Sequence, residues 1–151
     1  MITVQCENFA DVLEEWKLIL PEHWEELALN KDKVPLDMQY EAYHTMDALG
    51  QLFFASVRDA GELIGYFVGV ISPELHYKNC LSCNMDILYV RASHRKKWGG
   101  SKLISFVKKE LKRRGVKRLF GASKEHFDIG PLFVRHGAIL AEKTYLFWLG
   151  D

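Results

Sequence analysis

The sequence predicts an α/β domain with a mixed sheet, and three observations carry this prediction. Apolar residues recur at helical spacing in Phe9–Leu20. In Leu52–Ile71 they form two runs around a turn that contains Gly61, which indicates a β-hairpin. A strand at Leu81–Val90, a helix and a further strand then follow in order, and this order favours a parallel pair of strands.

Length and composition fit one domain over residues 1–151. With 151 residues, of which 48% are apolar, the chain can fill one core. No window approaches the roughly 18 unbroken apolar residues of a membrane span, and no secretory signal is visible at the start. Cys80 and Cys83 lack the second ligand pair of a zinc site and are interpreted as reduced packing residues. We therefore expect a cytoplasmic protein without a bound metal.

The first part of the chain is expected to be mostly helical. After a short strand at Ile2–Gln5, a helix starts at Phe9, and a second helix starts at Pro21, a residue that suits a first helical turn. A third helix is expected over Asp37–Leu49 and ended by Gly50.

The second part of the chain alternates between helices and strands. The expected elements are a helix over Gly100–Arg114 that Gly115 ends, a parallel strand over Val116–Ala122, a short helix over Gly130–His136, and closing strands at Ala138–Leu140 and Thr144–Leu149.

Charge is unevenly distributed along a chain whose formal net charge is zero. Of the 20 Lys and Arg residues, twelve lie between Arg91 and Arg118, with Glu110 as the one acid among them. A basic block of this kind indicates an anionic partner such as a nucleotide phosphate, a nucleic acid or an acidic surface. A solvated helix face accounts for part of it.

The loop Arg95–Ser101 carries the strongest chemical signal. The start of a helix presents unpaired N–H groups and a positive dipole end to an anion. Gly99 and Gly100 allow the backbone to approach that anion, and Ser101 adds a hydroxyl. Positive charge comes from Arg95, Lys96 and Lys97. The loop is neither a Walker loop nor GxGxxG, so we predict a metal-free phosphate cradle, with a simple Gly-Gly turn as the alternative.

This loop resembles the motif of the GNAT superfamily of N-acetyltransferases, in which Arg/Gln-x-x-Gly-x-Gly/Ala follows the fourth strand. The match is Arg95-Lys96-Lys97-Trp98-Gly99-Gly100. The resemblance extends over most of the chain, through Leu63–Tyr66, Asp86–Val90 and Gly130–Gly137. The segments Leu75–Tyr77 and His126–Leu132 look most like GNAT proteins found in bacteriophage genomes.

The resemblance implies a fold, a co-substrate and a reaction. The fold is a mostly antiparallel mixed sheet, flanked by helices, whose parallel central strands splay apart. Acetyl-CoA or another acyl-CoA lies with its pantetheine arm between these strands. A primary amine of a small molecule or protein attacks the thioester of this acyl-CoA directly. The cofactor-binding residues that the resemblance carries over are Leu88, Tyr89, Val90, Arg95, Lys96, Lys97, Trp98, Gly99, Gly100 and Ser101.

Asp86 and His126 are the expected catalytic residues. Period-two alternation places Asn84, Asp86 and Leu88 on one face of a strand, and an acid among apolar neighbours suits a general base. A hydrogen-bonded structural carboxylate is the alternative. In similar proteins, proton-handling or cofactor-contacting groups follow the fifth strand, where His126 lies; a surface histidine is the alternative.

Two positions depart from the family pattern. Trp98 stands where the motif has its first glycine, and Phe133 stands where many members have a tyrosine that protonates the leaving thiolate. These two departures leave an alternative function open, namely an inactive acyl-CoA-binding protein or a phage structural or interaction protein. Nucleic-acid binding by the basic helix Lys102–Arg118 is disfavoured because it lacks a helix-turn-helix partner. Phage origin would place the protein in the host cytoplasm, and a homodimer is left open.

Overall fold

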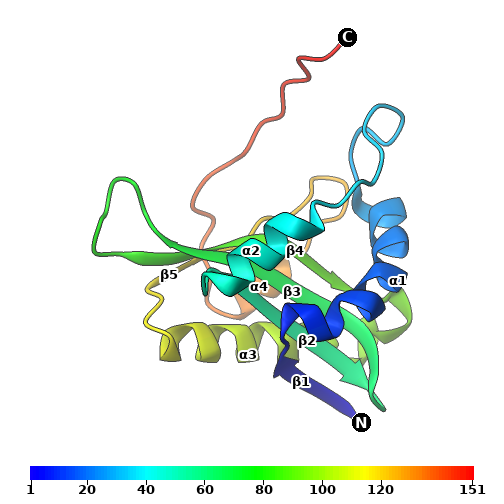
Figure 1. The fold of residues 1–151 in the computed structure, drawn as a ribbon, viewed down its shortest axis with the longest axis horizontal. Helices are drawn as coiled ribbons and strands as arrows, with labels where there is room; N and C mark the ends of the chain where they lie inside the picture. Colours follow the sequence, from blue (N-terminus) through cyan, green and yellow to red (C-terminus); the bar gives the residue numbers. More distant parts are fainter.

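The computed structural model describes residues 1–151 as a five-stranded sheet with helices on both faces (Figure 1). The strands are β1 (Ile2–Cys6), β2 (Leu52–Asp59), β3 (Glu62–Pro73), β4 (Leu81–Val90) and β5 (Arg118–Phe120). The helices are α1 (Phe9–Leu27), α2 (Tyr40–Ala48), the 3₁₀ helix η1 (Ala92–Lys97), α3 (Gly99–Arg113) and α4 (Gly130–Arg135). The strand order is β1-β2-β3-β4-β5, antiparallel except for the parallel pair β4 and β5, which confirms the predicted fold class.

The sheet separates two apolar cores. On one face, α3 packs Leu103, Val107 and Leu111 against strand side chains. On the other face, α1 packs Phe9 and Trp16 against a second set. The helical spacing of both apolar stripes explains why these segments are helices whose polar sides face solvent.

α1 continues through Pro21, so the expected start of a second helix at this residue is wrong. Proline removes the hydrogen bond to the carbonyl four residues earlier. The apolar stripe nevertheless runs on from Trp16 to Leu20 and Leu27, all of which contact the same core, and this packing keeps the helix in one piece. No helix has the length and hydropathy that a membrane-spanning segment requires.

A β-bulge in β4 changes the faces that this strand presents. The pairing with β3 skips Asp86, and an extra residue reverses the alternation of side chains beyond it. Met85 and Leu88 therefore contact the same core under α3, while the Asp86 carboxylate lies against Tyr43 of α2. The expectation that Asn84, Asp86 and Leu88 share one face is wrong for this reason.

The last part of the chain departs most from expectation. Residues 138–151 contain no strand, so the strands expected at Ala138–Leu140 and Thr144–Leu149 are wrong. The segment leaves the body after α4 and projects away from the sheet (Figure 1). A strand exists only where a neighbour completes its backbone hydrogen bonds, and this segment pairs with none within the chain.

The three cysteines form no disulfide. Cys83 is buried in the core under α3, and burial raises the pKa of its thiol to about 12. This thiol is a packing group at ordinary pH, in agreement with the sequence interpretation.

Candidate functional site

A gap opens beside the second half of β4. The parallel pairing with β5 ends at Asn84 and Phe120, while β4 continues to Val90. The Arg91 N–H donates to a β3 carbonyl, so by strand alternation the backbone groups of Val90 and Leu88 face the opposite edge. That edge has no strand partner over these residues, although the Val90 carbonyl already accepts a hydrogen bond from Arg95 Nε.

The gap leads to the first turn of α3. Gly99, Gly100 and Ser101 are its first residues, and their N–H groups have no acceptor inside the helix. A Cβ at Gly100 would lie 3.4 Å from Leu132 Cδ2, and a Cβ at Gly99 would lie 3.6 Å from Val90 Cγ1. Glycine at these positions lets the turn pack closely against Val90 and Leu132 without adding a side chain of its own, and the positive end of the helix dipole suits an anion there.

Trp98 precedes this turn in a left-handed conformation, with φ of +66°. This conformation favours glycine and costs other residues about 1–2 kcal/mol. The Trp98 side chain is 66% exposed, so the indole points away from the core and leaves the turn open.

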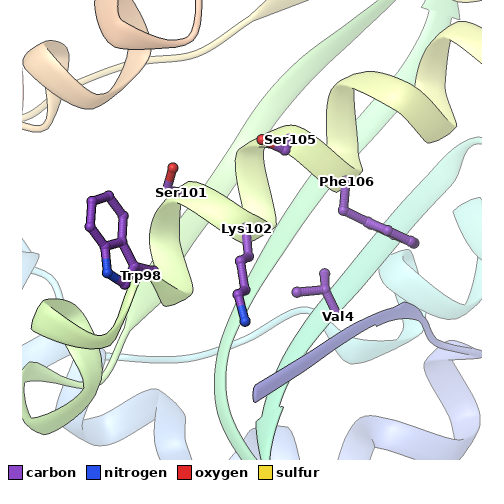
Figure 2. A pocket seen from close by; sticks show the side chains of 6 residues that line it. All are labelled: Val4, Trp98, Ser101, Lys102, Ser105 and Phe106. Atoms are coloured by element: carbon purple, nitrogen blue, oxygen red, sulfur yellow. The ribbon is translucent and has the colours of Figure 1, made fainter. Parts of the chain in front are cut away.

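A groove of about 510 Å³ lies along α3 beside the same turn. Its lining residues are Val4, Trp98, Ser101, Lys102, Ser105 and Phe106. Figure 2 shows Lys102 and Phe106 projecting from α3 toward Val4 on β1, with the Trp98 ring at the start of the helix. The groove combines an aromatic surface with one ammonium group.

Arg95 turns back toward α1 instead of the α3 turn. Its Nε donates to the Val90 carbonyl at 2.8 Å, and its guanidinium pairs with Glu26 at 2.5 Å. It also lies over the rings of Tyr89 and Phe127, 5.6 and 4.8 Å from their centroids. Arg95 thus spans the end of the gap, whereas the sequence suggested a contact with phosphate.

The other charged groups of the loop stay free of strong partners. Lys96 is exposed, and Lys97 Nζ lies 3.9 Å from Asp59 Oδ2. The Ser101 hydroxyl lies 2.8 Å from His136 Nε2, which ties α4 to the first turn of α3. The sequence did not identify His136, because nothing in its spacing shows that α4 folds back onto α3.

Asp86 lies on the opposite face of the sheet. The bulge leaves its carboxylate exposed, and this carboxylate accepts a hydrogen bond from the Tyr43 hydroxyl. Burial, together with this hydrogen bond, raises the pKa of Tyr43. The pair combines an accessible acceptor of protons with a neighbour that fixes its orientation.

A polar cluster lies where α1 crosses β3 and β4. His23 stacks on Tyr89 with centroids 4.6 Å apart, and its Nδ1 lies 2.7 Å from the Tyr66 hydroxyl. The Tyr89 hydroxyl donates to Glu22 at 2.7 Å. Burial lowers the pKa of His23 to about 4, so the imidazole is neutral near pH 7. Tyr89, expected among the cofactor contacts, belongs to this cluster, which the sequence did not reveal.

His126 lies in an exposed turn after β5. Phe127 of this turn contacts Arg95, but the His126 imidazole has no hydrogen-bond partner. The structure therefore brings the turn to the site without fixing the imidazole in it. No cluster of three or more His, Cys, Asp or Glu side chains is arranged to hold a metal ion.

The chain is similar in sequence to one family of enzymes. The model of the acetyltransferase (GNAT) family matches residues 10–129. No curated protein sequence matches the chain.

Solved structures share the fold at low identity. An aminoglycoside acetyltransferase from an uncultured soil metagenomic sample, in complex with sisomicin, has a TM-score of 0.73 at 11% identity, over 99% of this chain and 95% of that one. The ribosomal-protein-alanine N-acetyltransferase of Brucella melitensis gives 0.72 at 16%, over 99% and 100%. A predicted acetyltransferase of Clostridium acetobutylicum with acetyl-CoA gives 0.72 at 12%, over 99% and 97%. At these identities the likeness concerns the fold.

Proposed function

This chain belongs to the acetyltransferase (GNAT) family, and we propose that it is an N-acetyltransferase in which an amine directly attacks the thioester of acetyl-CoA. The observation that carries the proposal is the unpaired edge of β4 beside Leu88 and Val90, which leads to the glycine-containing first turn of α3. The acetyl-CoA in one structural neighbour, and the acetyltransferase activity named for two others, support it.

The residues along the gap fit an acyl-CoA. The backbone groups of Leu88 and the N–H of Val90, which have no strand partner, can bond the amides of a pantetheine arm as a neighbouring strand would. The amides of Gly99 and Gly100, at the positive end of α3, suit a pyrophosphate. The nearby loop adds the exposed Lys96 and Lys97 ammonium groups, and the groove adds the Trp98 indole and Lys102.

Asp86 is the proposed proton acceptor. Bound acetyl-CoA supplies a thioester carbonyl. The amine nitrogen forms the new C–N bond as the C–S bond breaks, and an Asp86 oxygen takes the proton that the amine loses. Tyr43 holds the carboxylate in place. Water protonates the departing thiolate, because Phe133 has no hydroxyl to donate.

The acceptor in this proposal is a primary amine of a small molecule or a protein. The structural neighbours include enzymes named for each kind, an aminoglycoside acetyltransferase and a ribosomal-protein-alanine N-acetyltransferase. The likeness of two loop segments to bacteriophage GNAT proteins extends the proposal to a phage-encoded enzyme in the host cytoplasm.

A second candidate function is acyl-CoA binding without transfer. Phe133 favours it, because its ring packs against Gly121, where a Cβ would lie only 3.0 Å from the Phe133 ring. The Phe133 ring therefore occupies this position without a hydroxyl that could donate a proton to the leaving thiolate.

Calorimetric titration with acetyl-CoA tests the proposal first. We expect saturable binding that weakens about tenfold in the double variant Lys96→Ala, Lys97→Ala, because two cations beside the first turn of α3 are lost. The matched control is Lys109→Ala, Lys112→Ala, which removes two exposed cations farther along α3 and leaves the affinity unchanged. Absence of saturable binding in the wild type would sink the proposal.

A thiol-release assay with a panel of amines then separates the two functions. Amine-dependent release supports the acetyltransferase. Saturable binding with no amine-dependent release supports the binding protein.

A further inference from the structure

The Arg95 side chain lies at the end of the unpaired edge of β4. Its Nε donates a hydrogen bond of 2.8 Å to the carbonyl of Val90, one of the backbone groups that face this edge. The pairing of β4 with β5 has already ended at Asn84 and Phe120, so no strand neighbour reaches this carbonyl. A side chain therefore occupies an acceptor that a ligand lying along the edge would use.

The guanidinium group of Arg95 connects the two sides of this opening. On the β4 side it lies 5.6 Å from the centroid of the Tyr89 ring. On the β5 side it lies 4.8 Å from the centroid of Phe127, which belongs to the turn that follows β5. A cation over the face of an aromatic ring is attracted to it. Arg95 thus joins β4 to the β5 side beyond the point where the two backbones pair.

Glu26 of α1 holds Arg95 in this position. Its carboxylate pairs with Arg95 Nη1 at 2.5 Å, and its second oxygen accepts from the Tyr89 hydroxyl at 3.4 Å. The two side chains of the ion pair are only 30% and 27% exposed, so solvent screens their attraction less than that of a fully exposed pair. The hydrogen bond from Arg95 lowers the pKa of Glu26, and the carboxylate is therefore ionised at neutral pH.

We propose that Arg95 is a latch, held shut by Glu26, that closes the acyl-CoA site until a pantetheine arm displaces it. The latch rests on the function proposed above. A pantetheine amide N–H replaces Arg95 Nε at the Val90 carbonyl, so one donor is exchanged for another. The guanidinium leaves Phe127 at the same time, which allows the arm to pass between the two sides of the opening.

Glu26 is a positioning residue in this proposal, because it acts on acyl-CoA only through Arg95. The exchange at Val90 conserves a hydrogen bond, so the contacts with Glu26 and the two rings set the fraction of chains that are open. The apparent dissociation constant rises as this fraction falls. With about one chain in ten open, acetyl-CoA binds about tenfold more weakly than it does to a chain without the latch.

Calorimetry on the full chain with Glu26→Gln tests the latch. The substitution keeps the size of the side chain and removes the charge that holds Arg95, so the dissociation constant of acetyl-CoA should fall about tenfold. Adenosine 3′,5′-bisphosphate has no pantetheine arm, and its dissociation constant should not change. Glu62→Gln is the matched control, because it removes an equal charge from the 2.5 Å pair with Arg91 and should alter neither value.

These titrations separate the latch from a general effect of charge. Equal tightening of both ligands by Glu26→Gln, or tightening of acetyl-CoA by Glu62→Gln, would overturn the latch, because lost repulsion of an anion would explain either result. If the wild type binds acetyl-CoA and Glu26→Gln binds it no better, the latch fails while the proposed function stands. If neither binds acetyl-CoA, both fail.

Arg95→Met gives a second test in which charge and latch have opposite effects. Loss of a cation alone would slow the association of anionic acetyl-CoA. Loss of the latch should instead raise the association rate about fivefold, after the slower approach has offset part of the gain. Stopped-flow tryptophan fluorescence measures the rate, and circular dichroism checks that the variant is folded. An association rate at or below that of the wild type would overturn the latch.

Discussion

The two faces of the sheet are built from different chemistry. Under α3 the core consists of apolar side chains such as Leu103 and Val107, and the polar side chains of the helix face solvent. Under α1 and α2 two of the buried aromatics, Tyr66 and Tyr89, carry hydroxyls, and the half-buried His23 lies against both of them. The comparison indicates a division of labour: the α3 face fixes the fold and carries the proposed anion site, and the α1–α2 face holds groups that can exchange protons.

Removing a core side chain of α3 should have the largest effect on stability. Leu103 is fully buried, so Leu103→Ala should lower the free energy of unfolding by about 3 kcal/mol through lost burial and a cavity. Leu18→Ala makes the same change at a 79% exposed position of α1 and should cost less than about 0.5 kcal/mol. Urea denaturation measures both. Equal losses of unfolding free energy in the two variants would show that the packing of α3 does not stabilise the core.

Changing Asp86 should show that the two faces of the sheet have different functions. Asp86→Asn keeps the size of the side chain but removes the proton acceptor, so kcat for amine acetylation should fall about 100-fold. The acetyl-CoA dissociation constant should not change, because the gap and the α3 turn are untouched. Asp32→Asn, in an exposed loop, is the control. An equal loss of acetyl-CoA affinity would argue for a structural role.

The half-buried imidazole of His23 should make the α1–α2 face sensitive to acid. The pKa of His23 is about 4, below its ordinary 6.5, so folding favours the neutral ring. This stabilisation is full above pH 6.5 and is lost as the pH falls toward 4, by about 1–3 kcal/mol. His23→Gln can still bond Tyr66 and does not titrate, so it should lose less stability between pH 7.5 and 4.5. The comparison requires urea denaturation at both pH values.

His126→Gln, at an exposed position, serves as the control for this titration. It should follow the wild-type curve. If His23→Gln also follows that curve, the imidazole does not govern the acid response of this face.

Relieving the left-handed residue before α3 should have the smallest effect. Trp98→Gly should raise the free energy of unfolding by about 0.5–1 kcal/mol, because glycine adopts positive φ without steric cost and the indole buries little. Ala92→Gly, in η1, should instead lower it by a similar amount. Thermal unfolding compares the two. A loss of stability in Trp98→Gly would mean that the indole packs in solution.

Local patterns in the sequence were enough to predict the main features of the α3 face. Helical spacing from Leu103 to Leu111 predicts α3, and adjacent glycines before this stripe predict an open first turn. Both features depend on near neighbours in the chain, so periodicity and backbone freedom reveal them. The continuity of α1 could not be read in this way, because packing against a distant core overrides the local effect of Pro21.

The sequence by itself determined the α/β class, the parallel pair β4 and β5, and the glycine turn that begins α3. Tertiary structure alone decided the rest. The bulge at Asp86, the return of Arg95 to Glu26 and the His23 cluster each join elements that lie far apart in the chain. The strand pattern of residues 144–149 likewise carries no partner of its own, because a strand forms only where another backbone completes its hydrogen bonds.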